Sequence, residues 1–286
     1  MWLAPLILAL ASGPWVAVVG VLCDGARHDT RAAGFFVAED LVVTALHAVT
    51  GSEPDDVPRS VTVVTADRRR YRVTRVEAID TARDAALLRV PCRCASWLRP
   101  APGASRGERL VVAGSPLRLD RGPLSVELTG PRIDELGDLR YRVDRALRGR
   151  SGSPALDAEG RYVGFVTTTH ELVPADVISR LLGRLSPVSL REAHLAVVRS
   201  PQGRLDFARS AYRRGDMQRA KGLLLDAVAV EPRLADAHNL LGVLLRREGR
   251  TEEAIAHYEL AIRYRPSYGP AFRNLGLLQA DLAVGR

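Results

Sequence analysis

Lysine, aromatic and cysteine residues are all scarce in this chain of 286 residues, and each shortage narrows what the protein can be. Lys221 is the only lysine, and aromatic residues make up 5% of the sequence. The formal net charge of +8 is therefore due almost wholly to arginine. Basic runs interleaved with aromatic side chains are typical of nucleic-acid-binding proteins, and this sequence has none. We therefore expect no nucleic-acid partner.

The three cysteines are Cys23, Cys92 and Cys94. Cys92 and Cys94 are separated by one residue and have no second ligand pair, so they lack the spacing of a structural zinc site. We expect neither a metal nor a cofactor. Two interpretations of the thiols stay open. Cys23 forms a disulfide with Cys92 or Cys94 in an exported protein, or the thiols are buried and reduced.

The first 23 residues carry no charged side chain. The apolar run from Met1 ends in the small residues Ala11, Ser12 and Gly13, which predicts a signal peptide over residues 1–12 that lacks the usual positive start. We therefore expect export to the periplasm or the medium. The alternative is a cytoplasmic protein in which residues 1–12 pack on the first domain. Gly13 and Pro14 interrupt the apolar run, so no stable membrane span is expected.

Short apolar runs separated by turn residues fill the first half of the chain. This pattern favours a β-barrel or a β-sandwich. A helix is expected over residues 177–185, with Asp176 as its N-cap. Residues 186–203 contain Pro187, Pro201 and Gly203 and are predicted to be a linker, so that the first domain covers residues 13–185. Strands are expected at 16–22, 34–37, 41–44, 61–64, 71–73, 85–90, 110–113, 124–128 and 162–166.

From residue 204 onward the sequence repeats with a period of 34 residues. Such a period, with small residues at helix crossings and a closing proline, is typical of tetratricopeptide repeats. Residues 204–286 are therefore predicted to form an all-α domain of about two and a half repeats. The matching pairs are Gly215 and Gly249, Ala220 and Ala254, Ala227 and Ala261, Pro232 and Pro266, and Gly242 and Gly276.

Three motifs in the first domain point to nucleophilic catalysis. Ser151 lies in Gly-Arg-Ser-Gly-Ser-Pro, His47 follows two predicted strands, and Asp84 opens an apolar strand. A serine hydroxyl needs a base to take its proton, and a histidine base needs a carboxylate to fix its tautomer. Asp80 is the competing carboxylate, and Asp84 is preferred because the strand begins directly after it.

These motifs and their order resemble the trypsin-like serine peptidases, especially the HtrA-type and glutamyl-endopeptidase branches. The resemblance covers residues 14 to 184. It implies two β-barrels with the site between them, His47 and Asp84 from the first and Ser151 from the second. It also implies Ser151 as nucleophile, His47 as general base and Asp84 as the group that orients it.

The same resemblance assigns further residues. The amides of Gly149 and Ser151 would form the oxyanion hole, and the Thr167 hydroxyl would lie near the catalytic aspartate. Arg145 would form the floor of the specificity pocket and favour an acidic substrate side chain, or else pair with Asp144 or face solvent. The strand after the nucleophile would form the wall of that pocket, and the substrate-binding residues there would be Val166, Thr167, Thr168 and Thr169.

The sequence therefore predicts a serine endopeptidase that cleaves polypeptides through an acyl-enzyme. The repeats would recruit or regulate through a protein or peptide partner. Arginines expected on their concave face suggest an acidic partner: Arg209, Arg213, Arg246 and Arg273, beside Asn239. The alternative is a catalytically idle barrel that acts as a scaffold for the repeat domain.

Overall fold

A computed structural model describes residues 14–25, 29–50, 54–81, 83–115, 117, 122–133, 139–167 and 170–283. The predicted signal peptide and the predicted pocket residues Thr168 and Thr169 lie outside these residues, as does the side chain of Arg213. The chain divides into two compact units, Met1–Leu195 and Ala196–Arg286. Among the described residues, no helix has both the length and the apolar character needed to cross a membrane.

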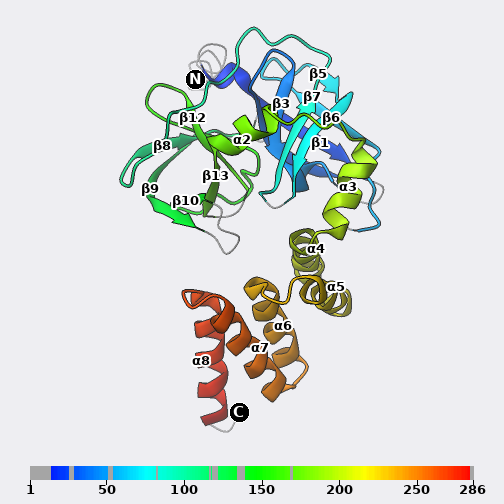
Figure 1. The fold of residues 1–286 in the computed structure, drawn as a ribbon, viewed down its shortest axis with the longest axis vertical. Helices are drawn as coiled ribbons and strands as arrows, with labels where there is room; N and C mark the ends of the chain where they lie inside the picture. The colour runs from blue at the N-terminus through cyan, green and yellow to red at the C-terminus, as the bar shows by residue number, and fades with distance from the viewer. Residues whose placement is uncertain are drawn as a thin grey trace, which may run out of the picture. The chain divides into compact units, whose positions relative to one another are not determined.

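The first unit begins with a seven-stranded antiparallel sheet of order β5-β4-β1-β2-β3-β7-β6 (Figure 1). A short 3-10 helix, η1 (Pro14–Ala17), precedes it, and η2 (Leu46–Ala48) follows its third strand. All five residues of β3 are buried, because this strand lies inside the sheet and its side chains are covered on both faces. The strands are β1 (Val18–Asp24), β2 (Thr30–Phe36), β3 (Leu41–Ala45), β4 (Ser60–Val64), β5 (Arg70–Arg72), β6 (Arg75–Asp80) and β7 (Ala85–Arg89).

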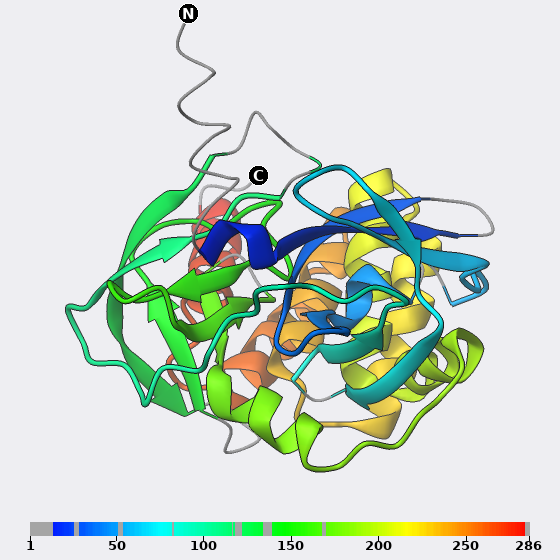
Figure 2. The same cartoon turned by 90° about the horizontal axis from the view of Figure 1, so that it is seen from above.

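Six further strands form a closed barrel of order β10-β13-β12-β11-β8-β9 beside the first sheet (Figures 1 and 2). Its centre is filled by buried apolar side chains that include Leu110, Val126 and Leu172. The expected fold class, an all-β first part followed by helical repeats, is confirmed, with a seven-stranded sheet and one closed barrel in place of the two expected barrels. The strands are β8 (Arg109–Val112), β9 (Leu124–Ile133), β10 (Leu139–Val143), β11 (Pro154–Leu156), β12 (Tyr162–Val166) and β13 (Glu171–Pro174).

Helix α2 (Ala175–Leu182) begins earlier than expected, and Asp176 is not its N-cap. The N-cap residue is Pro174, whose side chain makes no capping hydrogen bond, and Asp176 lies in the first helical turn. There its carboxylate is 3.0 Å from Arg180 one turn later, an i,i+4 ion pair on the helix surface.

The predicted linker over residues 186–203 is wrong. Residues Leu190–Arg199 form helix α3, and α4 starts at Pro201. Ser189 and Glu192 form a reciprocal capping box: each backbone N–H donates to the other's side chain, at 2.7 and 3.2 Å. The prolines that suggested a linker instead precede one helix and occupy the first turn of the next, a position that tolerates proline.

The second unit contains the helices α4 (Pro201–Arg214), α5 (Met217–Val230), α6 (Ala235–Arg247), α7 (Thr251–Tyr264) and α8 (Gly269–Ala283). The helices form two pairs, α4 with α5 and α6 with α7, and α8 follows them. One of the repeated glycines, Gly242, has a steric reason: a Cβ at this position would lie 2.5 Å from the Tyr258 ring on α7. The helix crossing therefore requires a residue without a side chain.

Candidate active site

His47 is held by Asp84 through two side-chain contacts. The Nδ1 atom of His47 lies 2.6 Å from Asp84 Oδ2, and the backbone N–H of His47 donates to Asp84 Oδ1 at 2.9 Å. The backbone N–H of Leu46 also donates to the Asp84 carbonyl at 3.0 Å. Strands β3 and β7 bring these residues together, since Ala45 pairs with Ala85. Nδ1 is therefore the protonated nitrogen, and the Nε2 edge of the ring faces away from Asp84.

Asp84 adopts a left-handed backbone conformation with a φ of +56°. Aspartate tolerates this region better than most residues. The competing Asp80 is engaged elsewhere: its carboxylate accepts hydrogen bonds from the Arg83 backbone at 3.0 Å and from the Arg83 guanidinium at 2.8 Å. The structure therefore pairs His47 with Asp84 and Asp80 with Arg83. The His47 side chain is 39% exposed, which leaves it accessible to a substrate.

Ser151 lies in a tight turn just before β11. Within this turn the Arg150 N–H donates to the Leu147 carbonyl at 3.1 Å, and the Ser153 N–H donates to the Arg150 carbonyl at 2.9 Å. Gly149 and Gly152 both have positive φ, +71° and +80°. These angles favour glycine and explain the G-x-S-G pattern on either side of Ser151.

The Ser151 turn is attached to the first sheet. The Ala33 N–H on β2 donates to the Ser151 carbonyl at 2.8 Å. A Cβ on Gly152 would lie 1.9 Å from the Ala33 carbonyl oxygen and 2.7 Å from Oγ1 of Thr44. Thr44 is on β3, three residues before His47, and its hydroxyl donates to the Ala33 carbonyl at 2.7 Å. The turn that carries Ser151 therefore meets the strand that leads to His47.

The backbone N–H groups of Gly149 and Ser151 donate to no acceptor within the described part of the chain. Sequence reasoning did not identify Arg150 as part of the site. Its guanidinium donates to the carbonyls of Ala113 at 3.2 Å and Gly122 at 2.8 Å, at the two ends of the connection between β8 and β9. Arg150 thus ties the Ser151 turn to the second barrel.

The predicted specificity pocket is not assembled as expected. Arg145 is 63% exposed and lies 3.5 Å from the Asp144 carboxylate, the alternative that the sequence left open. Val166 is buried among the apolar side chains of the second barrel, so its side chain does not line a pocket. Thr167 is also buried, and its hydroxyl has no hydrogen-bond partner in the described residues rather than reaching Asp84. No substrate preference follows from these three residues.

Within the described ranges, no group of three or more histidine, cysteine or acidic residues could hold a metal ion. Cys23, Cys92 and Cys94 form no disulfide. Burial raises the pKa of the Cys92 and Cys94 thiols, which keeps them protonated at neutral pH.

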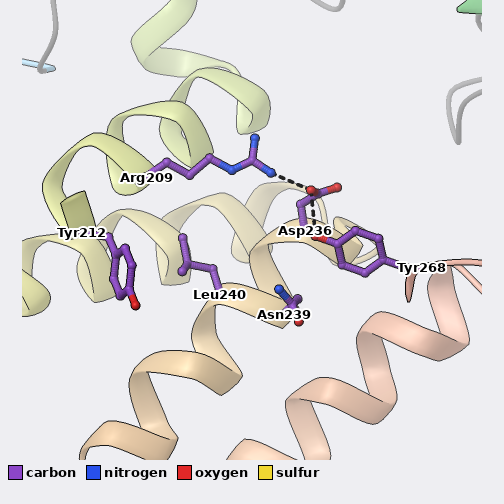
Figure 3. A pocket seen from close by; sticks show the side chains of 6 residues that line it. All are labelled: Arg209, Tyr212, Asp236, Asn239, Leu240 and Tyr268. Atoms are coloured by element: carbon purple, nitrogen blue, oxygen red, sulfur yellow. Dashed lines mark hydrogen bonds and ion pairs between the residues drawn. The ribbon is translucent and has the colours of Figure 1, made fainter. Parts of the chain in front are cut away.

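A hollow of about 200 Å³ lies on the helical repeats, among α4, α6 and the start of α8 (Figure 3). Arg209 and Asn239, both predicted for the concave face, line it. Asp236 accepts bonds from Arg209 at 2.5 Å, Arg265 at 2.6 Å and the Tyr268 hydroxyl at 3.0 Å. Burial alone would raise the pKa of Asp236, but the two guanidinium groups outweigh it and hold that pKa below its ordinary value.

Comparisons with known proteins agree with this architecture. Residues 32–165 match the family model of the trypsin-like peptidase domain, and residues 205–270 match that of the tetratricopeptide repeat. The chain therefore combines a trypsin-like peptidase domain with tetratricopeptide repeats. A search of curated proteins finds no match.

Solved structures resemble the first unit. The HtrA-type protease AlgW, in complex with a tripeptide, is 16% identical with a TM-score of 0.52, and 61% of each chain is covered. The active form of the Rv3671c protease from M. tuberculosis is 22% identical with a TM-score of 0.49, covering 64% of this chain and 87% of that chain. The family match supports a serine protease, and the likeness to AlgW supports the same fold.

Proposed function

We propose that the protein is a serine endopeptidase in which Ser151 is the nucleophile, His47 the general base and Asp84 the orienting carboxylate. The observation that carries the proposal is the 2.6 Å contact between His47 Nδ1 and Asp84, together with a glycine-flanked Ser151 turn that meets β3, the strand that leads to His47. A neutral histidine whose Nδ1–H is held by a carboxylate presents Nε2 as the proton acceptor.

The reaction follows the chemistry of acyl transfer. His47 takes the Ser151 hydroxyl proton as the oxygen attacks the substrate carbonyl, and Asp84 stabilises the imidazolium. The N–H groups of Gly149 and Ser151 stabilise the oxyanion of the tetrahedral intermediate. His47 then gives its proton to the leaving amine, which departs and leaves an acyl-enzyme. Water repeats these steps, with His47 again as base, and releases the acid product.

A fluorophosphonate probe combined with matched variants tests this proposal. Ser151→Ala and His47→Ala should each lower kcat by about 10⁶-fold, and Asp84→Asn by about 10⁴-fold, because the three groups act as one unit. Asp80→Asn is the control, since Asp80 is bonded to Arg83. Full turnover in Ser151→Ala would refute the assignment. Folded wild-type protein that the probe does not label would support the idle scaffold instead.

The tetratricopeptide repeats are proposed to recruit a polypeptide on the face formed by α4, α6 and α8. The argument for an acidic partner is weaker than expected, because two of the predicted arginines already form ion pairs within the repeats, Arg209 with Asp236 and Arg246 with Asp281. The exposed Arg273 remains available for such a partner.

A variant that ends at Ser200 tests this role, because it keeps α3 and lacks the repeats. It should cleave short peptides like the full chain and cleave a folded protein substrate more slowly. Equal rates on all protein substrates would argue against recruitment.

A further inference from the structure

His194 on α3 is fully buried, and both of its ring nitrogens contact backbone carbonyls of the first unit. Its Nδ1 contacts the carbonyl oxygen of Thr50, and its Nε2 lies 2.8 Å from the carbonyl oxygen of Pro54. His194 lies 144 residues after Thr50 and 140 residues after Pro54 in the sequence. The side chain is therefore a cross-link between α3 and the segment after His47.

The chemistry of this cross-link defines its donor state. Carbonyl oxygens only accept hydrogen bonds, and a neutral imidazole has only one N–H. A neutral ring therefore donates to Thr50 or to Pro54, according to its tautomer. Asp55 and Asp56 follow Pro54 directly, and Asp56 is fully buried, so carboxyl groups lie on the segment that the ring holds.

Thr50 is coupled to the short element that carries His47. Its hydroxyl donates to the Leu46 carbonyl at 3.1 Å, and the Val49 N–H donates to the same carbonyl at 3.0 Å. Asp84 fixes the beginning of this element through the N–H groups of Leu46 and His47. Because η2 has only three residues, these few contacts at its two ends determine the orientation of His47.

We infer that His194 is a positioning residue for His47, and that α3 is a working part of the peptidase domain. The proposal rests on the proposed function, since it assigns His47 its catalytic role. Asp84 fixes the His47 ring from one side, and His194 fixes the Thr50 end of the same element through a backbone carbonyl.

The attachment of α3 does not depend on His194 alone. The N–H groups of Ser186 and Val188 donate to the carbonyls of Glu77 and Val76 on β6, at 2.9 and 2.8 Å. Ala193 is buried as well, and the Ser189–Glu192 capping box starts the helix. A substitution of His194 is therefore expected to release Thr50 and Pro54 while α3 remains attached.

The test uses the full chain with His194→Phe, which removes both ring nitrogens, and His194→Gln, which keeps an N–H donor. His238→Phe is the matched control, because His238 is also a buried histidine with contacts at both ring nitrogens, but it lies in the repeats. The measurements are kcat and KM on a short peptide, and hydrogen exchange of the Leu46 and His47 amides. Ring-nitrogen NMR shifts of wild-type His194 add a readout that needs no variant.

We expect His194→Phe to lower kcat by about ten- to one-hundredfold with KM changed less than twofold, since small displacements of a catalytic group have effects of that size. His194→Gln should retain an intermediate kcat. Both variants should speed exchange at Leu46 and His47, and His238→Phe should change neither. The NMR shifts should show a hydrogen-bonded N–H on the His194 ring of the wild type.

Wild-type kcat and wild-type exchange in His194→Gln would overturn the inference, as would a lowered kcat with unchanged exchange at Leu46 and His47. If His194→Phe does not fold, His194→Gln decides by the same two measurements. A wild-type protein without peptidase activity would refute the proposed function alone, because the exchange rates and the ring-nitrogen shifts still report whether His194 holds the His47 element.

Discussion

Gly152→Ala should damage catalysis far more than an alanine at another glycine of the same backbone conformation. Gly152 has a φ of +80°, and Gly107, with a φ of +83°, is the matched control because a Cβ there meets nothing within 4 Å. The left-handed conformation costs an alanine about 1–2 kcal/mol at either position. Gly107→Ala should therefore lose about that much stability and keep its activity.

At Gly152 a steric term adds to this conformational cost. The new Cβ would lie 1.9 Å from the Ala33 carbonyl oxygen, so the turn and β2 must separate by about 1.5 Å to reach an ordinary 3.4 Å contact. That movement breaks the 2.8 Å hydrogen bond from the Ala33 N–H to the Ser151 carbonyl. Overpacking of this kind adds about 1–3 kcal/mol. Displacement of the nucleophile by about 1 Å lowers turnover by about one hundredfold.

Urea unfolding and kcat/KM on a short peptide measure the two effects. Gly152→Ala should lose about 2–5 kcal/mol of stability, the sum of strain and overpacking, together with most of its kcat/KM. The reasoning would be refuted if Gly152→Ala and Gly107→Ala lost equal stability and both kept kcat/KM within twofold of the wild type.

Three further predictions concern the repeats and the N-terminus. Burial lowers the pKa of His238. Burial and the charge of the neighbouring His238 also lower the pKa of His257, although Glu253 partly opposes this shift. Since the unfolded value is about 6.5, the repeats should be fully stable above that pH and lose stability as the pH falls below it. His257→Gln should flatten this dependence in urea unfolding at pH 5 and 7.5, and an unchanged slope would contradict it. Asp236→Asn should cost about 2–3 kcal/mol, less than a fully buried pair because Arg209 is 37% exposed. The control Asp206→Asn, whose carboxylate is 3.4 Å from Arg209, should cost under about 1 kcal/mol in thermal unfolding. Similar losses would show that Asp236 is not the centre of the network. N-terminal sequencing should find an exported protein beginning near Gly13 or Pro14, and an intact Met1 on cytoplasmic protein would reject export.

The turns and strands that carry Asp84 and Ser151, like most strands, could be predicted because their signals are local. Asp84 precedes a run of buried apolar residues, and Ser151 is flanked by glycines whose backbone angles require them. The strands β6 and β10 were not expected, because Arg75, Arg140 and Arg142 interrupt their apolar pattern. Arg75 and Arg142 are exposed and Arg140 is half-buried, so each strand buries only part of its side chains.

The specificity pocket could not be predicted, because the direction in which its side chains point depends on three-dimensional contacts that are not visible in the sequence. Arg145 and Val166 were placed by resemblance alone. Whether the Arg145 guanidinium turns inward depends on the neighbouring Asp144, which attracts it at the surface. Val166 lies in a strand with every residue buried, so alternation could not show which side it faces.

The C-terminal boundary of the peptidase domain was also misplaced, because the contacts that define it cannot be read from the sequence. Prolines around residues 187 and 201 suggested a linker, although Ser189 and Glu192 already carried the local signal for a helix start. That capping box could have predicted α3, but not what α3 binds. The partner of His194 is a pair of backbone carbonyls, and a carbonyl has no sequence signature because every residue has one. A contact of this kind can link a helix outside the recognisable motif to the element that carries His47 without leaving any pattern in the sequence. The functional boundary of such a domain therefore has to be set by its buried polar contacts rather than by the extent of its motifs.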